Sequence, residues 1–271
     1  MTLRFVKMHG AANDFVVLDH RAPFLPADAR ALFARLCDRR RGVGADGVLL
    51  LENDPEHDFA MRYHNADGGE AEFCGNGARC IARFALDLGL GRDGAVTFRT
   101  AAGVKSARSV PDGRIALEFG RVSDGERVRL ESGGRTVEGR LVGAGVPHLV
   151  VPVADVSGVP LAEVAPPLRH HARFAPAGAN VDFVALRPDG RCAMRTYERG
   201  VEGETLACGS GAIASALWAV LDAGARSPVT VRTAGGDDLV VRFDSGPGGR
   251  EATLTGPAEI AFRGEWTDAR G

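Results

Sequence analysis

One motif occurs twice in this 271-residue chain and constrains its fold more than any other feature. Residues 74–78 read Cys-Gly-Asn-Gly-Ala, and residues 208–212 read Cys-Gly-Ser-Gly-Ala. An apolar run of helical character follows each copy, to about Leu88 in the first and about Leu221 in the second. The second run is apolar on nearly every side, so a helix formed from it must be buried on nearly every side. The motif therefore predicts two central helices, each enclosed by other elements.

A cysteine at this position lies at a helix N-terminus, where backbone N–H groups and the helix dipole favour a thiolate. The adjacent glycines let a ligand approach the backbone closely and leave N–H groups to hold a carboxylate. A cysteine that only fills a core needs no such glycines, and that simpler interpretation suits Cys37, Cys80 and Cys192. We expect Cys74 and Cys208 to be a pair of thiols that act on one substrate from opposite sides.

Strand-like segments separated by Asp-Gly and Gly-Gly turns flank both helices. Strands are expected near residues 3–6, 15–18, 48–52, 58–64, 96–100, 115–119, 128–130, 149–153, 181–186, 229–233, 239–243 and 252–255. A further helix is expected from Pro26 to about Arg40. The predicted fold class is α+β, with two pseudo-symmetric domains, each a curled, mainly antiparallel sheet or barrel around a central helix.

An internal repeat supports two related domains. Ungapped alignment of residues 63–78 with residues 197–212 places identical residues at seven positions. A second similarity aligns residues 12–16 with residues 179–184, and it leaves the helix near 26–40 without a clear counterpart after Val184. The polar, turn-like segment 120–125 marks the expected boundary. This gives an N-terminal domain of residues 1–121 and a C-terminal domain of residues 122–258.

Composition and spacing argue against several classes of function. The formal net charge of −2 gives no basic surface for nucleic acid or an acidic membrane. No signal-peptide core or membrane-spanning run is seen, so we expect a cytoplasmic protein with reduced thiols. Cys74 and Cys80 have five residues between them and no complementary histidine cluster, so no metal site is expected. Residues 42–47 match G-x-G-x-x-G, but they follow a helix and precede a strand, the reverse of a dinucleotide site.

The sequence resembles diaminopimelate epimerase over nearly the whole chain, from Leu3 to the second cysteine helix. The motifs that carry the resemblance are residues 7–10, 13–15, 42–47, 65–68, 74–80, 197–200 and 204–209. The resemblance implies an isomerase without a cofactor that interconverts LL- and meso-2,6-diaminopimelate, in lysine and peptidoglycan-precursor biosynthesis. It also implies a homodimer and a C-terminal strand, within residues 259–271, that returns to the first domain.

The resemblance also implies roles for individual residues. One of Cys74 and Cys208 would remove the α-proton as a thiolate while the other donates its own proton. The residues whose N–H groups would bind the α-carboxylate are Gly75, Asn76, Gly209 and Ser210. The residues that resemble those holding the distal amino-acid group are Asn13, Asn65, Asn180 and Arg199. The residues that resemble those adjusting cysteine protonation are His148 and Glu198.

Taken alone, several of these residues have simpler interpretations. Asn13 and Asn180 are typical of turns, His148 of an ordinary loop, and Glu198 of a solvated surface. The sequence also departs from the family pattern at three positions. Val146 stands where an asparagine is usual and cannot supply an amide, Glu202 is an additional residue, and Ser210 replaces the usual threonine. The Val146 change leaves the exact substrate open.

Two alternatives follow. One is another two-cysteine racemase or epimerase of the same superfamily, such as a proline-racemase-like enzyme. The other is a non-catalytic binding protein on the same scaffold, against which the presence of both cysteines argues. Arg199 and the three asparagines favour a long substrate with a second amino-acid head. Two facing thiols would also form a reversible Cys74–Cys208 disulfide on oxidation.

Overall fold

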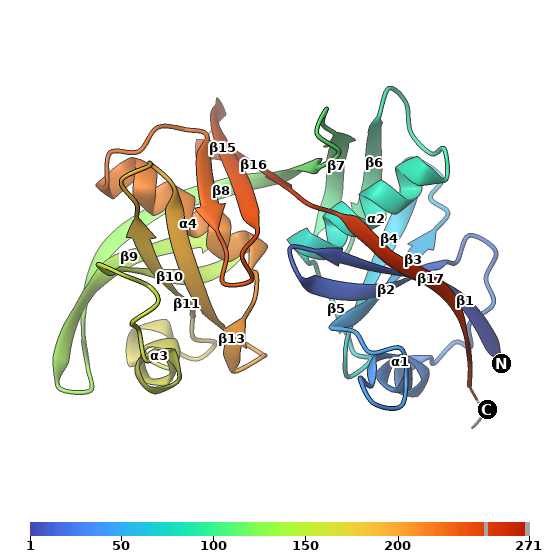
Figure 1. Ribbon diagram of the computed structural model, residues 1–271, viewed down its shortest axis with the longest axis horizontal. Helices are drawn as coiled ribbons and strands as arrows, with labels where there is room; N and C mark the ends of the chain where they lie inside the picture. The colour runs from blue at the N-terminus through green and yellow to red at the C-terminus, as the bar shows by residue number, and fades with distance from the viewer. Residues whose placement is uncertain (247–248, 269–271) are drawn as a thin grey trace. The chain divides into compact units, whose positions relative to one another are not determined.

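The structure is a computed structural model that describes residues 1–246 and 249–268 (Figure 1). The chain forms two compact units. The first unit comprises Met1–Glu118 and the chain from Gly256 onward, and the second comprises Phe119–Thr255. The chain passes from the first unit to the second within strand β8 (Ile115–Ser132). Among the described residues, no helix has the length and apolar character that crossing a membrane requires.

Both units repeat the same order of elements. The first contains β1 (Thr2–Gly10), β2 (Asn13–Asp19), α1 (Arg30–Cys37), β3 (Gly47–Glu52), β4 (Phe59–Asn65), β5 (Glu70–Ala71), α2 (Gly75–Asp87), β6 (Ala95–Thr100), β7 (Gly103–Ser109) and the start of β8. The second continues with β9 (Arg135–Ala144), β10 (Val146–Pro152), α3 (Leu161–Arg169), a 3₁₀ turn (Ala172–Phe174), β11 (Asn180–Leu186), β12 (Cys192–Glu198), β13 (Gly203–Thr205), α4 (Gly209–Asp222), β14 (Val229–Arg232), β15 (Asp238–Gly246) and β16 (Gly249–Gly256). The last strand, β17 (Glu259–Thr267), belongs to the first unit and pairs with β1 (Figure 1).

Strand pairing follows one pattern in both units. The parallel pairs β2–β3 and β4–β6 of the first unit correspond to β10–β11 and β12–β14 of the second. The neighbouring pairs β1–β2, β3–β4 and β6–β7 are antiparallel, as are β9–β10, β11–β12 and β14–β15. The predicted fold class, a curled and mainly antiparallel sheet built twice, is confirmed.

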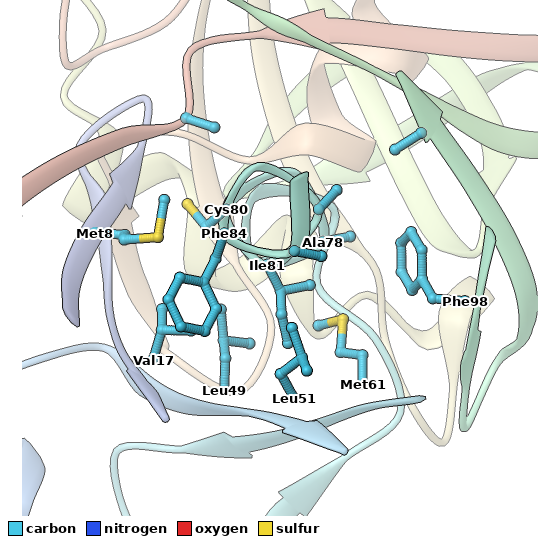
Figure 2. Packing of buried hydrophobic residues seen from close by; sticks show 14 of the residues in the cluster. Met8, Val17, Leu49, Leu51, Met61, Ala78, Cys80, Ile81, Phe84 and Phe98 are labelled. Carbon is cyan, nitrogen blue, oxygen red and sulfur yellow. The ribbon is translucent and has the colours of Figure 1, made fainter. Parts of the chain in front are cut away.

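Helix α2 is the core of the first unit. It packs against β1, β2, β3, β4, β6 and β7, and Figure 2 shows side chains of the surrounding elements converging on it. Strand β2 serves two cores because alternate side chains point to opposite faces. Phe15 and Val17 face α2, whereas Val16 and Leu18 face the cluster that includes Leu32 of α1. The sheet is therefore buried on both faces here, which explains its continuous apolar runs.

Helix α4 has the same position in the second unit. It packs against β9, β10, β11, β12, β14 and β15. Ile213 and Leu217 are fully buried, as the all-round apolar pattern predicts. A second helix, α3, covers the outer face of this sheet through Leu161, Ala165 and Leu168. The expectation of one central helix in each unit is confirmed.

The second sequence similarity, residues 12–16 with 179–184, is not a structural equivalence. Asn13 begins β2, the first strand of a parallel pair, whereas Asn180 begins β11, the second strand of the corresponding pair. The counterpart of β2 is therefore β10, and the counterpart of α1 is α3, which precedes β11. Helix α3 contains Pro166 and Pro167, which disfavour a helix and hide it in the sequence.

The segment 120–125 is also not a turn. It lies inside β8, and the register of β8 against β9 shifts between Ser123 and Glu126. Gly120 and Gly125 have φ values of +105° and +61°, a backbone conformation that favours glycine. Glycines in a strand often mark such irregularities. The glycine-rich composition that predicts a turn therefore serves a bulged strand.

Candidate active site

Cys74 caps the N-terminus of α2. Its backbone is extended, with φ −137° and ψ 119°, and its sulfur accepts a hydrogen bond from the Gly77 N–H at 3.5 Å. The Ala78 N–H bonds to the Cys74 carbonyl and begins the helical ladder. This is N-cap geometry with a thiol as the acceptor. The side chain of Cys74 is half-buried.

Cys208 caps α4 in the same way. Its φ and ψ are −124° and 115°, and its sulfur accepts a hydrogen bond from the Gly211 N–H at 3.4 Å. The Ala212 N–H bonds to the Cys208 carbonyl. The repeated Cys-Gly-x-Gly-Ala motif thus produces the same local structure twice. Cys208 differs in exposure, since only 4% of its surface is accessible.

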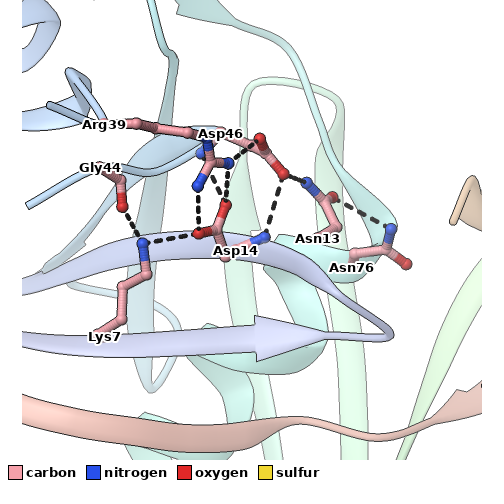
Figure 3. Close-up of polar contacts among 7 residues, drawn as sticks. All are labelled: Lys7, Asn13, Asp14, Arg39, Gly44, Asp46 and Asn76. Atoms are coloured by element: carbon pink, nitrogen blue, oxygen red, sulfur yellow. Dashed lines mark hydrogen bonds and ion pairs between the residues drawn. The ribbon is translucent and has the colours of Figure 1, made fainter. Parts of the chain in front are cut away.

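Asn13 lies beside Cys74, and Figure 3 shows its side chain between those of Asp46 and Asn76. Its Nδ2 donates a hydrogen bond to Asp46 at 2.7 Å, and a carboxylate can only accept. The Oδ1 of Asn13 is therefore the atom that faces the site. There it accepts from Asn76 Nδ2 at 3.1 Å and from the Cys74 thiol at 3.6 Å. The structure brings Asn13, Asn76 and Cys74 into one cluster, here called the Cys74 site.

A network of charged side chains next to the Cys74 site holds Asn13 in place through Asp46 (Figure 3). Arg39 donates to Asp14 at 2.7 Å and to Asp46 at 2.6 Å, and Lys7 lies 2.7 Å from Asp14. Burial alone would raise the pKa of Asp14, but hydrogen bonds and charges from Arg39 and Lys7 outweigh it and lower that pKa to about 2. Asp14 therefore stays ionised and Asp46 keeps the orientation that fixes Asn13.

Arg79 fixes the second amide of the Cys74 site. This arginine is fully buried and donates to Asn76 Oδ1 at 2.9 Å and to the Pro257 carbonyl at 3.4 Å. Asn76 Oδ1 is thereby an acceptor, and its Nδ2 points at Asn13. Sequence reasoning missed Arg79 and Asp46. Arg79 lies within the first cysteine motif, and a charged residue inside an otherwise apolar helix is the signal that could have indicated it.

His148 and Asp182 form a fully buried pair under the N-terminus of α4. Both side chains are inaccessible to solvent, and His148 Nδ1 lies 2.7 Å from Asp182 Oδ2. His148 Nε2 lies 2.9 Å from Ser210 Oγ, which lies 3.4 Å from Cys208 Sγ. His148, Asp182, Ser210, Cys208 and Asn180 are here called the Cys208 site. Asp182 was not expected from sequence, although an aspartate inside the apolar strand Val181–Leu186 is a visible anomaly.

Asn180 joins the same network. Its Oδ1 accepts the Arg199 backbone N–H at 2.7 Å, and its Nδ2 lies 3.3 Å from His148 Nε2. Glu198 accepts a hydrogen bond from Thr205 Oγ1 at 2.8 Å. The structure therefore brings His148, Ser210 and Asn180 together around Cys208.

Asn65 and Arg199 occupy matching positions of the repeat, each two residues after Tyr63 or Tyr197. Asn65 is exposed at the end of β4. In the part of the chain that the structure describes, neither the Asn65 amide nor the Arg199 guanidinium has a hydrogen-bond or ion-pair partner. Both side chains are thus available to a ligand.

The additional residue Glu202 fixes the loop that follows Arg199. It has a φ of +54°, and its carboxylate accepts from Arg169 of α3 at 2.8 Å and from the Gly200 N–H at 3.1 Å. The Tyr197 hydroxyl donates to the Glu202 carbonyl at 2.8 Å. The insertion is therefore integrated into the fold.

Val146, the other main departure, lines an open hollow of about 680 Å³ together with Pro147 and Gly145.

The five cysteines are free thiols in different environments. Burial raises the pKa of Cys37, Cys80 and Cys192 to about 12, so these three are inert core residues. Burial also raises the pKa of Cys208 well above its usual value, and the charges of Glu198 and Asp182 add to that effect. Hydrogen bonds from Ser210 and the Gly211 N–H act in the opposite direction.

Comparison with known proteins identifies the family of the chain. The family model for diaminopimelate epimerase matches residues 5–124 and 140–260. The chain belongs to the diaminopimelate epimerase family. Diaminopimelate epimerases of Aromatoleum aromaticum and Aquifex aeolicus are 40% and 38% identical to it, and each alignment covers 98% of this chain and 99% or 98% of the relative. The chain is accordingly an isomerase of the epimerase class.

Solved structures share the fold at lower identity. A phenazine biosynthesis protein of the PhzF family from Bacillus anthracis superposes with a TM-score of 0.71 at 15% identity, covering 99% of this chain and all of that one. A hydroxyproline epimerase from Agrobacterium vitis gives 0.68 at 18% identity, covering 97% and 92%. At these identities the likeness establishes the fold alone.

Proposed function

We propose that this chain interconverts LL- and meso-2,6-diaminopimelate with its two helix-capping cysteines as the acid and the base. The observation that carries the proposal is the duplicated cap. Cys74 and Cys208 have similar backbone angles, and the sulfur of each accepts a hydrogen bond from the backbone N–H three residues later. Inversion at Cα needs a base on one face and an acid on the other. Family membership supports diaminopimelate as the substrate.

In the proposed reaction, one thiolate removes the α-proton and the other thiol delivers its proton to the opposite face. The family resemblance implies a reaction without a cofactor, so protein groups must stabilise the negative charge that spreads onto the α-carboxylate when the α-proton is removed. The first N–H groups of a helix have no intrahelical acceptor. Those at Gly75, Asn76, Gly209 and Ser210 are therefore suited to the carboxylate, and the two helix dipoles assist them.

The distal amino-acid head would be held by side chains that lack a protein partner. Asn65 and Arg199 meet that description in the described residues, and Arg199 suits a bidentate contact with a carboxylate. Asn13 and Asn180 already have oriented amides. By family likeness we place the reaction in the cytoplasmic route to lysine and peptidoglycan precursor and propose a homodimer. Size-exclusion chromatography with light scattering tests the dimer.

The decisive experiment is incubation of LL-diaminopimelate with the protein in deuterated water. We expect meso-diaminopimelate that carries deuterium at the inverted carbon, read by chiral chromatography with mass spectrometry. Absence of both inversion and exchange would contradict an epimerase of this substrate. The same assay with L-proline and trans-4-hydroxy-L-proline tests the alternative, another racemase of the superfamily, which Val146 keeps open because it lacks the usual amide. Exchange on those substrates, with diaminopimelate inert, would establish that alternative.

A further inference from the structure

The turns that carry Asn65 and Arg199 differ at one repeat-related position. The ungapped alignment of the repeat pairs Gly68 of the first unit with Glu202 of the second. Both residues have a positive φ, +79° for Gly68 and +54° for Glu202. Residue 68 has to be glycine, since a Cβ there would overlap the Arg30 carbonyl oxygen of α1. Glutamate in this conformation is strained, and such a residue persists only when its surroundings hold it.

Three groups hold the Glu202 carboxylate. Arg169 Nη2 donates to it at 2.8 Å, the Gly200 N–H donates to it at 3.1 Å, and His170 Nε2 lies 3.3 Å from it. The hydrogen bond from Gly200 lowers the pKa of Glu202 against the opposing effect of burial, and Arg169 lowers that pKa further. The carboxylate is therefore ionised at neutral pH. It connects the turn after Arg199 with the C-terminal end of α3.

Arg169 is a fixed anchor for this connection. Only 7% of its surface is accessible, and its Nη1 donates to the Ala177 carbonyl at 3.0 Å. Gly178 makes room for it, since a Cβ at residue 178 would overlap Arg169 Nη1. Helix α3 is itself held on the sheet by its apolar face. Loss of the Glu202 carboxylate would leave this buried guanidinium without the acidic partner that the structure gives it.

We propose that Glu202 is a positioning residue of the substrate site, which ties the Arg199 turn to α3 and holds the guanidinium ready for a second carboxylate of the substrate. The Arg199 backbone N–H bonds to Asn180 Oδ1 at 2.7 Å, and the next N–H, that of Gly200, bonds to Glu202. The main chain on which the guanidinium depends is therefore fixed. A turn that is ordered before binding loses less entropy when a ligand binds. This deepens the proposed function and rests on it for the identity of the ligand.

In the first unit the corresponding connection is exposed. Asp67 pairs with Arg30 of α1 at 3.1 Å, and the two side chains are 65% and 66% accessible. An ion pair in solvent contributes little. The buried connection thus lies beside Arg199, whose long side chain has more rotamer freedom than that of Asn65 and gains more from a fixed backbone.

Steady-state kinetics with LL-diaminopimelate tests the role of Glu202. Glu202→Gly removes the side chain in a backbone conformation that glycine adopts freely, so the variant should remain folded. It should raise KM about tenfold and change kcat less than about twofold, because a contact that is equal in the substrate complex and the transition state affects KM alone. Glu202→Gln keeps an acceptor for the Gly200 N–H but loses the charge, and should raise KM about threefold. Glu163→Gln alters an exposed carboxylate of the same helix and should leave both constants unchanged.

Two further measurements separate positioning from a general loss of stability. In the Arg199→Ala background, Glu202→Gly should change kcat/KM less than about twofold, because the guanidinium that Glu202 positions is gone. Amide hydrogen exchange followed by NMR should show Gly200 exchanging about tenfold faster in Glu202→Gly than in the wild type. An unchanged KM, a full tenfold loss of kcat/KM in the Arg199→Ala background, or equal exchange rates at Gly200 would each overturn the inference. A wild type that is inert toward diaminopimelate would refute the proposed function, and the exchange rates at Gly200 would still decide whether Glu202 anchors the turn.

Discussion

Helices α2 and α4 begin with the same cysteine-capped turn, but different residues pack beneath that turn in each helix. Beneath Gly77 of α2 lie Leu49 Cδ2 at 3.1 Å and Phe15 at 3.5 Å from a virtual Cβ, all apolar. Beneath Gly211 of α4 lie Asp182 and Thr196, connected to His148. The half-buried Cys74 donates to an amide oxygen, and the buried Cys208 meets a hydroxyl.

This contrast shows how duplication gives symmetry of backbone without symmetry of chemistry. Short-range sequence sets the cap, because only residues 74–78 or 208–212 take part in it. The surroundings come from other strands and differ in polarity. The Cys74 site depends on two amides that charged residues orient, Asn13 through Asp46 and Asn76 through the buried Arg79. The Cys208 site depends on a buried chain of hydrogen-bonding groups from Asp182 through His148 to Ser210. Two thiols that would exchange acid and base roles in the proposed reaction thus lie in unequal environments.

The largest effect should come from removing either thiol. Cys74→Ala and Cys208→Ala should each lower the rate of epimerisation at least ~10³-fold, because each removes one of the two proton-transfer groups. The LL-to-meso ratio over time measures this loss. Cys37→Ala and Cys192→Ala, which alter core thiols in the first and second units, are matched controls. Substantial epimerisation by either site variant would mean that the two sites do not work as a pair.

The next largest effect should distinguish the residues packed beneath Gly211 from those packed beneath Gly77. Gly211→Ala should cost about 2 kcal/mol of unfolding free energy, because its methyl group meets a fixed carboxylate at 2.6 Å. Gly77→Ala meets the flexible end of Leu49 at 3.1 Å and should cost less than about 1 kcal/mol, since alanine also favours the helix. Urea denaturation measures both. Equal losses of unfolding free energy in the two variants would show that the polar residues beneath Gly211 are no more rigid than the apolar residues beneath Gly77.

The charged network next to the Cys74 site predicts that the unfolding free energy of the protein depends on pH in the acid range. Asp14 has a pKa of about 2 in the folded protein against 3.8 for the unperturbed carboxyl. Because the folded value is lower, the stabilisation is complete above about pH 4 and is lost as the pH falls through about 2. Asp14→Asn should therefore lower unfolding free energy by about 2 kcal/mol at pH 7 and by almost nothing at pH 2. Denaturation curves at both pH values test this, and a constant difference would contradict it.

The smallest effect compares the thiols themselves. At pH 8 iodoacetamide should label half-buried Cys74 roughly tenfold faster than Cys208, because burial and two nearby carboxylates raise the pKa of Cys208. Cys37, Cys80 and Cys192, whose pKa values are near 12, should remain unlabelled in the folded protein. Peptide mass spectrometry gives all five rates from one sample. A faster Cys208 would reverse the comparison of the two environments.

Much of the fold could be predicted because its signals are local. The all-round apolar character of residues 212–221 places α4 at the centre of a sheet, and the strand of residues 48–52 needs burial on both faces. Strands β7 and β9 escaped notice because they carry many exposed polar residues and little hydrophobic alternation. Helix α3 was hidden by its two prolines, and the bulge in β8 by glycines typical of turns.

By itself, the sequence determined the two caps and the two buried helices, since a Cys-Gly-x-Gly-Ala turn followed by an apolar run contains the residues that form them. It could not determine what lies beneath each cap. Leu49 and Asp182 are separated from the cysteines by 25 and 26 residues, and only the pairing of strands carries them there. Strand pairing depends on register across the whole sheet. The tertiary structure alone therefore decided that one cysteine rests on hydrocarbon and the other on a buried Asp–His–Ser chain.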